Sequence, residues 1–106
     1  MHAFSALADP TRRQIVELLA DGERTASDIV RHFEVSAPAI SQHLKVLKAA
    51  RLVTARADAQ RRVYRLAPEG LDEIDAWMDE VRSYWSGRLD ELERALERDD
   101  TEGGNS

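Results

Sequence analysis

A stripe of apolar residues in the last third of the chain constrains the fold most strongly. Its apolar side chains recur at spacings of three and four residues, the period of one face of an α-helix. The pattern predicts a single helix over about residues 68–98, on the order of 45 Å long. The stripe consists of Leu71, Ile74, Met78, Val81, Trp85, Leu89, Leu92 and Leu96, with Trp77 and Tyr84 on its shoulder.

The rest of the chain is too small to cover such a stripe. The protein has 106 residues, which suits one domain with a modest core. An uncovered apolar strip of this length is typical of a partner interface, most often that of a two-fold dimer. Residues 1–98 are therefore predicted to form one domain with a dimerisation helix at about 68–98, and the polar residues 99–106 a disordered tail.

Helix signals before this stripe predict a helix-turn-helix. A short helical stretch over Ala3–Ala8 precedes a helix that Asp9 and Pro10 begin and Gly22 ends. Thr25, with Asp28 three residues later, resembles a capping box for a helix over 26–33. The turn 34–36 is short, and Ser36 is a suitable N-cap for a third helix that runs to about Ala50.

The two faces of the helix over 36–50 differ in chemistry. Ile40, His43, Leu44 and Leu47 are predicted to face inward. The outward face is small and polar with one lysine, which suits a helix that enters a groove of DNA, although a solvated helix face is the alternative. That outward face consists of Pro38, Ser41, Gln42, Lys45 and Ala49.

Two short runs after this helix are typical of strands. Residues 52–56 and 62–66 flank a turn at 57–61, so they predict a hairpin. A helix-turn-helix followed by a basic hairpin is a winged helix. The predicted fold is therefore mainly α with a small β-hairpin: a winged helix-turn-helix with a long C-terminal dimerisation helix.

Charge is divided unevenly along the chain. The overall net charge is -5, but residues 1–66 carry 11 basic and 7 acidic side chains, whereas residues 67–106 carry 4 and 13. The segment 36–66 has a net charge of +6. A local field of this sign favours a nucleic-acid partner for the first part of the chain. The acidic residues Asp72, Asp75 and Asp79 share one face of the last helix, where a solvated acidic surface is favoured over a cation site.

Three separated motifs, in order and at matching spacing, resemble the ArsR family of bacterial winged-helix repressors. They cover about residues 3–98 and comprise Ala6-Leu7-Ala8-Asp9-Pro10-Thr11-Arg12-Arg13, Ser36-Ala37-Pro38-Ala39-Ile40-Ser41-Gln42-His43-Leu44-Lys45-Val46-Leu47, and Leu52-Val53 with Arg61-Arg62-Val63-Tyr64-Arg65-Leu66. The resemblance implies a homodimer that represses transcription by placing two recognition helices on an imperfect palindrome in double-stranded DNA.

The resemblance also indicates which side chains carry these roles. The residues expected to contact DNA are Ser36, Pro38, Ser41, Gln42, His43, Lys45, Lys48, Arg61 and Arg62. The homodimer built from the first and last helices is expected to bury Phe4, Leu7, Ile74, Trp77, Met78, Val81, Tyr84, Trp85, Leu89 and Leu92. A small-molecule pocket at Trp77 and Trp85, between the paired helices, is the alternative for the two tryptophans.

The sequence departs from the family's metal sensors and from its usual glycines. It has no cysteine for a thiolate site, and its histidines, His2, His32 and His43, lie outside the last helix, so we expect no metal ion and no cofactor. The chain resembles a subgroup that lacks the metal sites. Arg51 stands where many members carry glycine, and the wing tip at 57–60 lacks the usual glycine.

Other function classes find little support. The chain has no phosphate-binding glycine loop, nucleophile elbow or cysteine nucleophile, which argues against an enzyme. No apolar run is long enough to span a membrane and no leader pattern is visible, so a cytoplasmic location is expected. The remaining alternative is a winged-helix dimer that binds proteins or small ligands without specific DNA binding. The sequence does not specify a small-molecule inducer.

Overall fold

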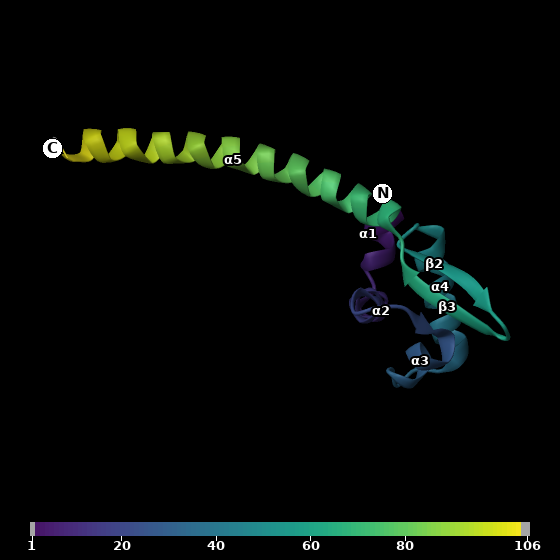
Figure 1. Cartoon of the computed structure of the whole chain (residues 1–106). Helices are drawn as coiled ribbons and strands as arrows, with labels where there is room; N and C mark the ends of the chain where they lie inside the picture. Colours follow the sequence, from purple (N-terminus) through teal and green to yellow (C-terminus); the bar gives the residue numbers. More distant parts are fainter. Residues whose placement is uncertain (1, 105–106) are drawn as a thin grey trace. The chain divides into compact units, whose positions relative to one another are not determined.

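The computed structural model describes residues 2–104, with side chains described as far as Asp99. In chain order its elements are α1 (His2–Leu7), α2 (Pro10–Ala20), β1 (Arg24–Thr25), α3 (Ala26–Arg31), α4 (Ala37–Ala49), β2 (Val53–Asp58), β3 (Arg61–Leu66) and α5 (Pro68–Gly104) (Figure 1). The described residues form two compact units that divide between Ile74 and Asp75, and α5 runs through both.

Side-chain caps fix where three helices begin. The Asp9 carboxylate accepts hydrogen bonds from the backbone N–H groups of Thr11 (2.8 Å) and Arg12 (3.1 Å) at the start of α2. Thr25 Oγ1 caps α3 and Ser36 Oγ caps α4, each by accepting the N–H three residues on. These side chains satisfy donors that a helix leaves unpaired, and all three predicted caps are confirmed.

The hairpin is confirmed, but the sheet is larger than predicted. Its three antiparallel strands have the order β1-β3-β2, because the short strand β1 pairs with Val63 and Tyr64 of β3. The pairing of β2 with β3 continues to Asp58 opposite Arg61, which leaves only two residues in the turn rather than the predicted 57–61. Ala59 turns the chain there with a φ of 56°.

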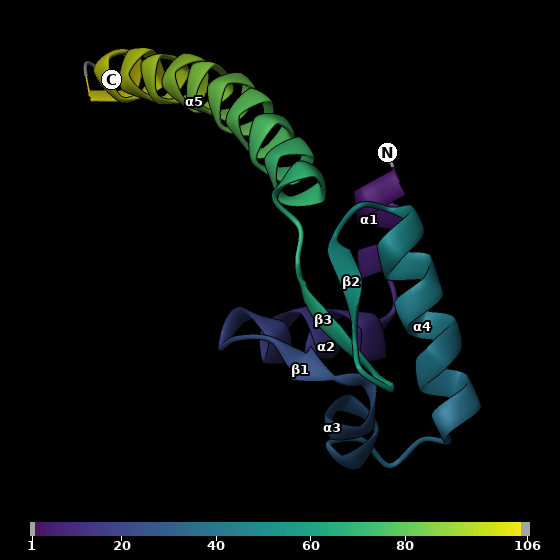
Figure 2. The ribbon, with the colours of Figure 1, turned by 45° about the vertical axis from the view of Figure 1, so that its right-hand side comes forward.

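The core of the first unit lies between helices α1 to α4 and the sheet. Its largest fully buried side chains are Ile15, Ile29, Ile40, Leu47, Leu52 and Val53. β2 follows α4 directly and runs back along it, so the wing tip and the amino-terminal end of α4 lie at the same end of the unit (Figure 2). This arrangement places the basic hairpin beside the predicted recognition helix.

The start of α5 belongs to the same unit. Leu71 and Ile74 pack against the core, and the Gly70 N–H donates to the Arg51 carbonyl oxygen at 2.8 Å. A Cβ at Gly70 would lie 2.6 Å from that oxygen, so the contact requires glycine. No helix in the described range is both long enough and apolar enough to span a bilayer.

The far end of α5 differs from the sequence prediction. The helix continues to Gly104, whereas the sequence predicted a disordered tail from Asp99. A polar segment without proline can extend a helix that has already formed, because each added residue gains a hydrogen bond without a new nucleation step. Residues 105 and 106 of the predicted tail lie outside the described residues.

Candidate nucleic-acid interface

The outward face of α4 is polar and open to solvent. Ser41, Gln42 and Lys45 are exposed, whereas Ile40, Leu44 and Leu47 are buried in the core. The predicted division into two faces is therefore confirmed. Of the residues expected to contact DNA, His43 is half-buried and the others are exposed: Ser36, Pro38, Ser41, Gln42, Lys45, Lys48, Arg61 and Arg62.

The arginines at the wing tip differ in their partners. Arg61 pairs with Asp58 across the turn, with a guanidinium nitrogen 2.8 Å from a carboxylate oxygen. Arg62 and Lys45 make no ion pair within the described residues, so their positive charges are uncompensated. Further along the wing, Arg56 of β2 is paired with Glu23 at 2.7 Å. The positive charge of Arg62 is therefore available to an anionic partner, whereas the charge of Arg61 is partly balanced by Asp58.

A small polar cluster joins α2 to the other edge of α4. Arg12 Nη1 lies 3.4 Å from His43 Nδ1, and the Arg12 Nε–H donates to the carbonyl oxygen of Ala6. The pKa of Asp9 lies below its ordinary value of 3.8, first because its carboxylate accepts the Arg12 backbone N–H and further because it accepts the Thr11 N–H and the Arg12 guanidinium is nearby. Through Arg12, the cluster connects α2 to Ala6 of α1 and to His43 of α4.

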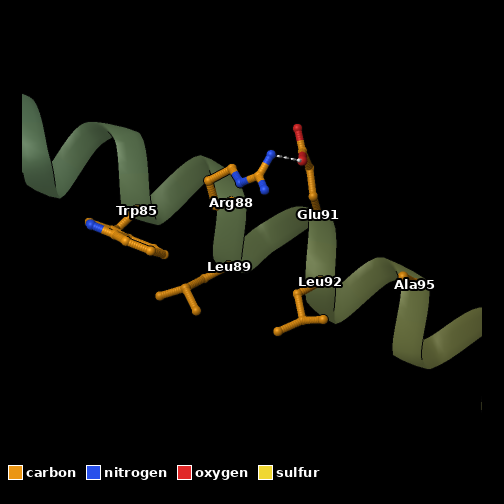
Figure 3. Close-up of a pocket in the computed structure, with 6 residues that line it drawn as sticks. All are labelled: Trp85, Arg88, Leu89, Glu91, Leu92 and Ala95. Carbon is orange, nitrogen blue, oxygen red and sulfur yellow. Dashed lines mark ion pairs between the residues drawn. The ribbon is translucent and has the colours of Figure 1, made fainter.

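The second unit carries the exposed part of the apolar stripe. Leu89, Leu92 and Trp85 are 58%, 54% and 54% exposed, and Tyr84 is 59% exposed. Figure 3 shows Trp85, Leu89 and Leu92 on one side of α5 and the ion pair of Arg88 with Glu91 (3.9 Å) on the other. The rings of Tyr84 and Trp85 are nearly perpendicular, with an interplanar angle of 83° and a centroid separation of 5.4 Å. Of the predicted interface residues, Trp77 is also exposed, while the rest are half-buried: Phe4, Leu7, Ile74, Met78 and Val81.

Comparison with known proteins identifies the family. Residues 9–55, which extend from the Asp9 cap through α4 into β2, match the model described as "Bacterial regulatory protein, arsR family". The chain is 49% identical over 87 residues to HTH-type transcriptional regulator Rv2034 of Mycobacterium tuberculosis, an alignment that covers 82% of this chain and 78% of that protein. The chain belongs to the arsR family.

Two further matches of this arsR-family protein agree with the assignment to that family. It is 42% identical over 77 residues to transcriptional repressor SdpR of Bacillus subtilis, covering 73% of this chain and 86% of the repressor. A solution structure of a homodimeric winged helix-turn-helix DNA-binding domain from Mycobacterium bovis is similar with a TM-score of 0.63 and 34% identity, covering 77% of this chain and 76% of that domain.

The structure of this arsR-family protein also shows contacts that the sequence patterns did not predict. The sequence placed His43 on the inward edge of α4 but did not identify Arg12 as its neighbour, because the two residues are 31 positions apart. The Asp9-Pro10-Thr11-Arg12 motif is the available signal: it predicts the start of a helix and supports the family resemblance, but it does not predict a contact of Arg12 with α4. Within the described residues, no group of three or more histidine, aspartate or glutamate side chains is placed to hold a metal ion.

Proposed function

We propose that this arsR-family protein is a homodimeric repressor that binds an imperfect palindrome in bacterial DNA. The observation that carries the proposal is the exposed, polar face of α4 beside the unpaired Arg62 of the wing. The proposal is supported by the similarity of this chain to a transcriptional regulator, to a transcriptional repressor and to a homodimeric DNA-binding domain.

The residues of α4 divide into two roles on DNA. The side-chain amide of Gln42 can donate to and accept from an adenine edge in the major groove, and Ser41 and Lys45 are placed beside it to read neighbouring bases. Lys48, Arg61 and Arg62 contact phosphates, which orients the protein on the duplex without reading sequence. Base contacts therefore supply the sequence preference, and phosphate contacts supply most of the affinity.

The exposed stripe of α5 joins two copies. Burying apolar surface stabilises an interface by roughly 25 cal/mol per Å², and Trp85, Leu89 and Leu92 are each more than half exposed in one copy. A two-fold dimer presents both α4 helices to the same side of the duplex, so the two half-sites lie one helical turn apart or a multiple of it. Bound at a promoter, the dimer blocks transcription. It acts by binding DNA rather than by catalysis. It acts in the cytoplasm, where the chromosome lies.

Selection of DNA fragments from the protein's own genome tests the proposal. Purified wild-type protein is expected to enrich a few fragments that share a palindrome. The variant Gln42→Ala should bind the same fragments about 1–3 kcal/mol more weakly and relax the preference at one position in each half-site. As a control, Arg98→Gln removes a positive charge far along α5 from α4 in the sequence, and this variant should enrich the same fragments as the wild type.

Two results would contradict DNA repression. If no fragment is enriched even at low salt, the chain is a winged-helix dimer that binds a protein or a small molecule instead. If fragments are enriched but Gln42→Ala and wild type select the same sequences with the same affinity, α4 does not read the bases.

A further inference from the structure

Arg12 connects the recognition helix to the two helices before it. Its side chain starts from the first turn of α2, donates from Nε to the Ala6 carbonyl oxygen of α1, and places Nη1 3.4 Å from Nδ1 of His43 on α4. One guanidinium therefore holds the imidazole of His43 from the side of α4 that faces α1 and α2.

A hydrogen bond between Arg12 and His43 requires that Nδ1 of His43 acts as the acceptor. A guanidinium has five N–H donors and no acceptor, so Nδ1 of His43 must accept the hydrogen bond. An imidazole that accepts at Nδ1 is neutral and carries its proton on Nε2. The contact with Arg12 therefore makes Nε2 a hydrogen-bond donor.

Nε2 of His43 is not fully buried. It has no hydrogen-bond partner among the described residues, and the only buried side-chain nitrogen or oxygen without a partner in that part of the chain is Nε of Arg24. The next residue along α4 towards its amino terminus is Gln42, which is exposed on the polar face. His43 itself is half-buried, so it lies at the border between the buried side of α4 and the exposed face proposed to meet DNA.

We propose that Arg12 is a positioning residue that holds His43 as the Nε2–H tautomer, and that this nitrogen donates to a phosphate of bound DNA at the α2 side of α4. The inference rests on the proposed function. In this proposal His43 contacts DNA through an uncharged side chain, whereas Lys45, Lys48 and Arg62 are positively charged. A neutral donor adds affinity but releases no counterion, so its contribution does not depend on salt.

Two substitutions at His43 distinguish the role of Nδ1 from the role of Nε2. The side-chain oxygen of His43→Asn can accept from Arg12 in place of Nδ1, but nothing replaces Nε2. This variant should bind the selected DNA about tenfold more weakly at every salt concentration, with the wild-type salt slope. His43→Gln places its amide nitrogen near the position of Nε2 and should stay within about threefold of wild type.

The outcomes distinguish this inference from the proposed function. If wild type binds no DNA, both fail. If wild type binds but the two His43 variants bind equally well, or His43→Asn lowers the salt slope by about one, the neutral phosphate contact is wrong while the proposed function stands.

Imidazole ¹⁵N NMR of the DNA-free protein tests the tautomer directly. At about pH 8, above the range in which histidine usually titrates, Nδ1 of His43 should resonate as an unprotonated nitrogen and Nε2 as a protonated one. Arg12→Gln should move His43 towards a mixture of tautomers. Arg13→Gln is the matched control, because Arg13 donates only to the carbonyl oxygens of Leu7 and Ala8. A protonated Nδ1 in wild type, or equal spectra for wild type and Arg12→Gln, would overturn the inference.

Discussion

At the scale of single residues, two residues other than glycine in the described part of the chain adopt left-handed backbone conformations. Arg51 has a φ of 59° and Ala59 a φ of 56°. Arg51 directly follows the cap of α4: its N–H donates to the Lys48 carbonyl, and the N–H of Leu52 donates to that of Leu47. These two bonds form a Schellman motif, whose left-handed position glycine usually fills.

Arg51→Gly should therefore stabilise the protein. Glycine adopts this conformation without the Cβ clash, which costs roughly 1–2 kcal/mol for other residues, although its freer unfolded chain offsets part of the gain. We expect a gain of about 1 kcal/mol in urea unfolding. Arg51→Ala controls for loss of the side chain and should leave stability nearly unchanged. If Arg51→Gly is less stable than wild type, the Arg51 side chain stabilises the folded state by more than its left-handed backbone destabilises it.

Local contacts were predictable at this scale, and distant ones were not. The caps Asp9, Thr25 and Ser36 act on N–H groups two or three residues away, so short motifs predict them. The contact between Arg12 and His43 depends on how α2 packs against α4. No spacing rule in the sequence encodes it.

At the scale of elements, the helix-turn-helix and the hairpin followed from the sequence, whereas β1 did not. Arg24 and Thr25 are too short a run to show strand periodicity, and they are a strand only because β3 offers them partners. The turn of the hairpin is tighter than its sequence suggests, because Ala59 adopts a conformation that is rare without glycine. Pairing partners and strained turns depend on tertiary structure.

The wing provides a prediction that compares neighbouring arginines. Arg62→Ala should weaken binding to all DNA sequences by a similar factor and lower the salt slope by about one for each copy of the dimer, because it removes an unpaired charge from a phosphate. Arg61→Ala should have a smaller effect, since Asp58 already balances that charge. Fluorescence anisotropy at several salt concentrations measures both. Equal slopes for Arg62→Ala and wild type would place the wing away from DNA.

At the scale of the whole molecule, the apolar stripe of α5 was predicted from spacing alone, and the described side chains leave its second half, from Trp85 to Leu96, exposed. Leu89→Glu should produce monomers or unfolded protein, because a charge would have to be buried in the interface. Ser83→Glu is the control, since residue 83 lies on the opposite side of the helix. Sedimentation velocity at micromolar concentration reads the result. A wild-type protein that sediments as a folded monomer would rule out the dimer.

Metal ions should not regulate this molecule. The chain has no cysteine, and none of its three histidines, His2, His32 and His43, lies on α5. Zinc, nickel, cadmium or arsenite at stoichiometric concentration should therefore leave DNA affinity unchanged. Anisotropy with and without each ion, and with a chelator as control, measures this. Release of DNA by any one of them would reveal a site formed between copies, for which His2 would be the first candidate ligand.

The salt dependence of binding to a genome-selected fragment tests the central claim most directly. A dimer that neutralises several phosphates with Lys48, Arg61 and Arg62 of each copy should lose affinity steeply as salt rises, and a scrambled fragment of equal length should bind far more weakly. A flat salt dependence, or equal affinity for the selected and scrambled fragments, would contradict sequence-specific DNA binding through α4 and the wing.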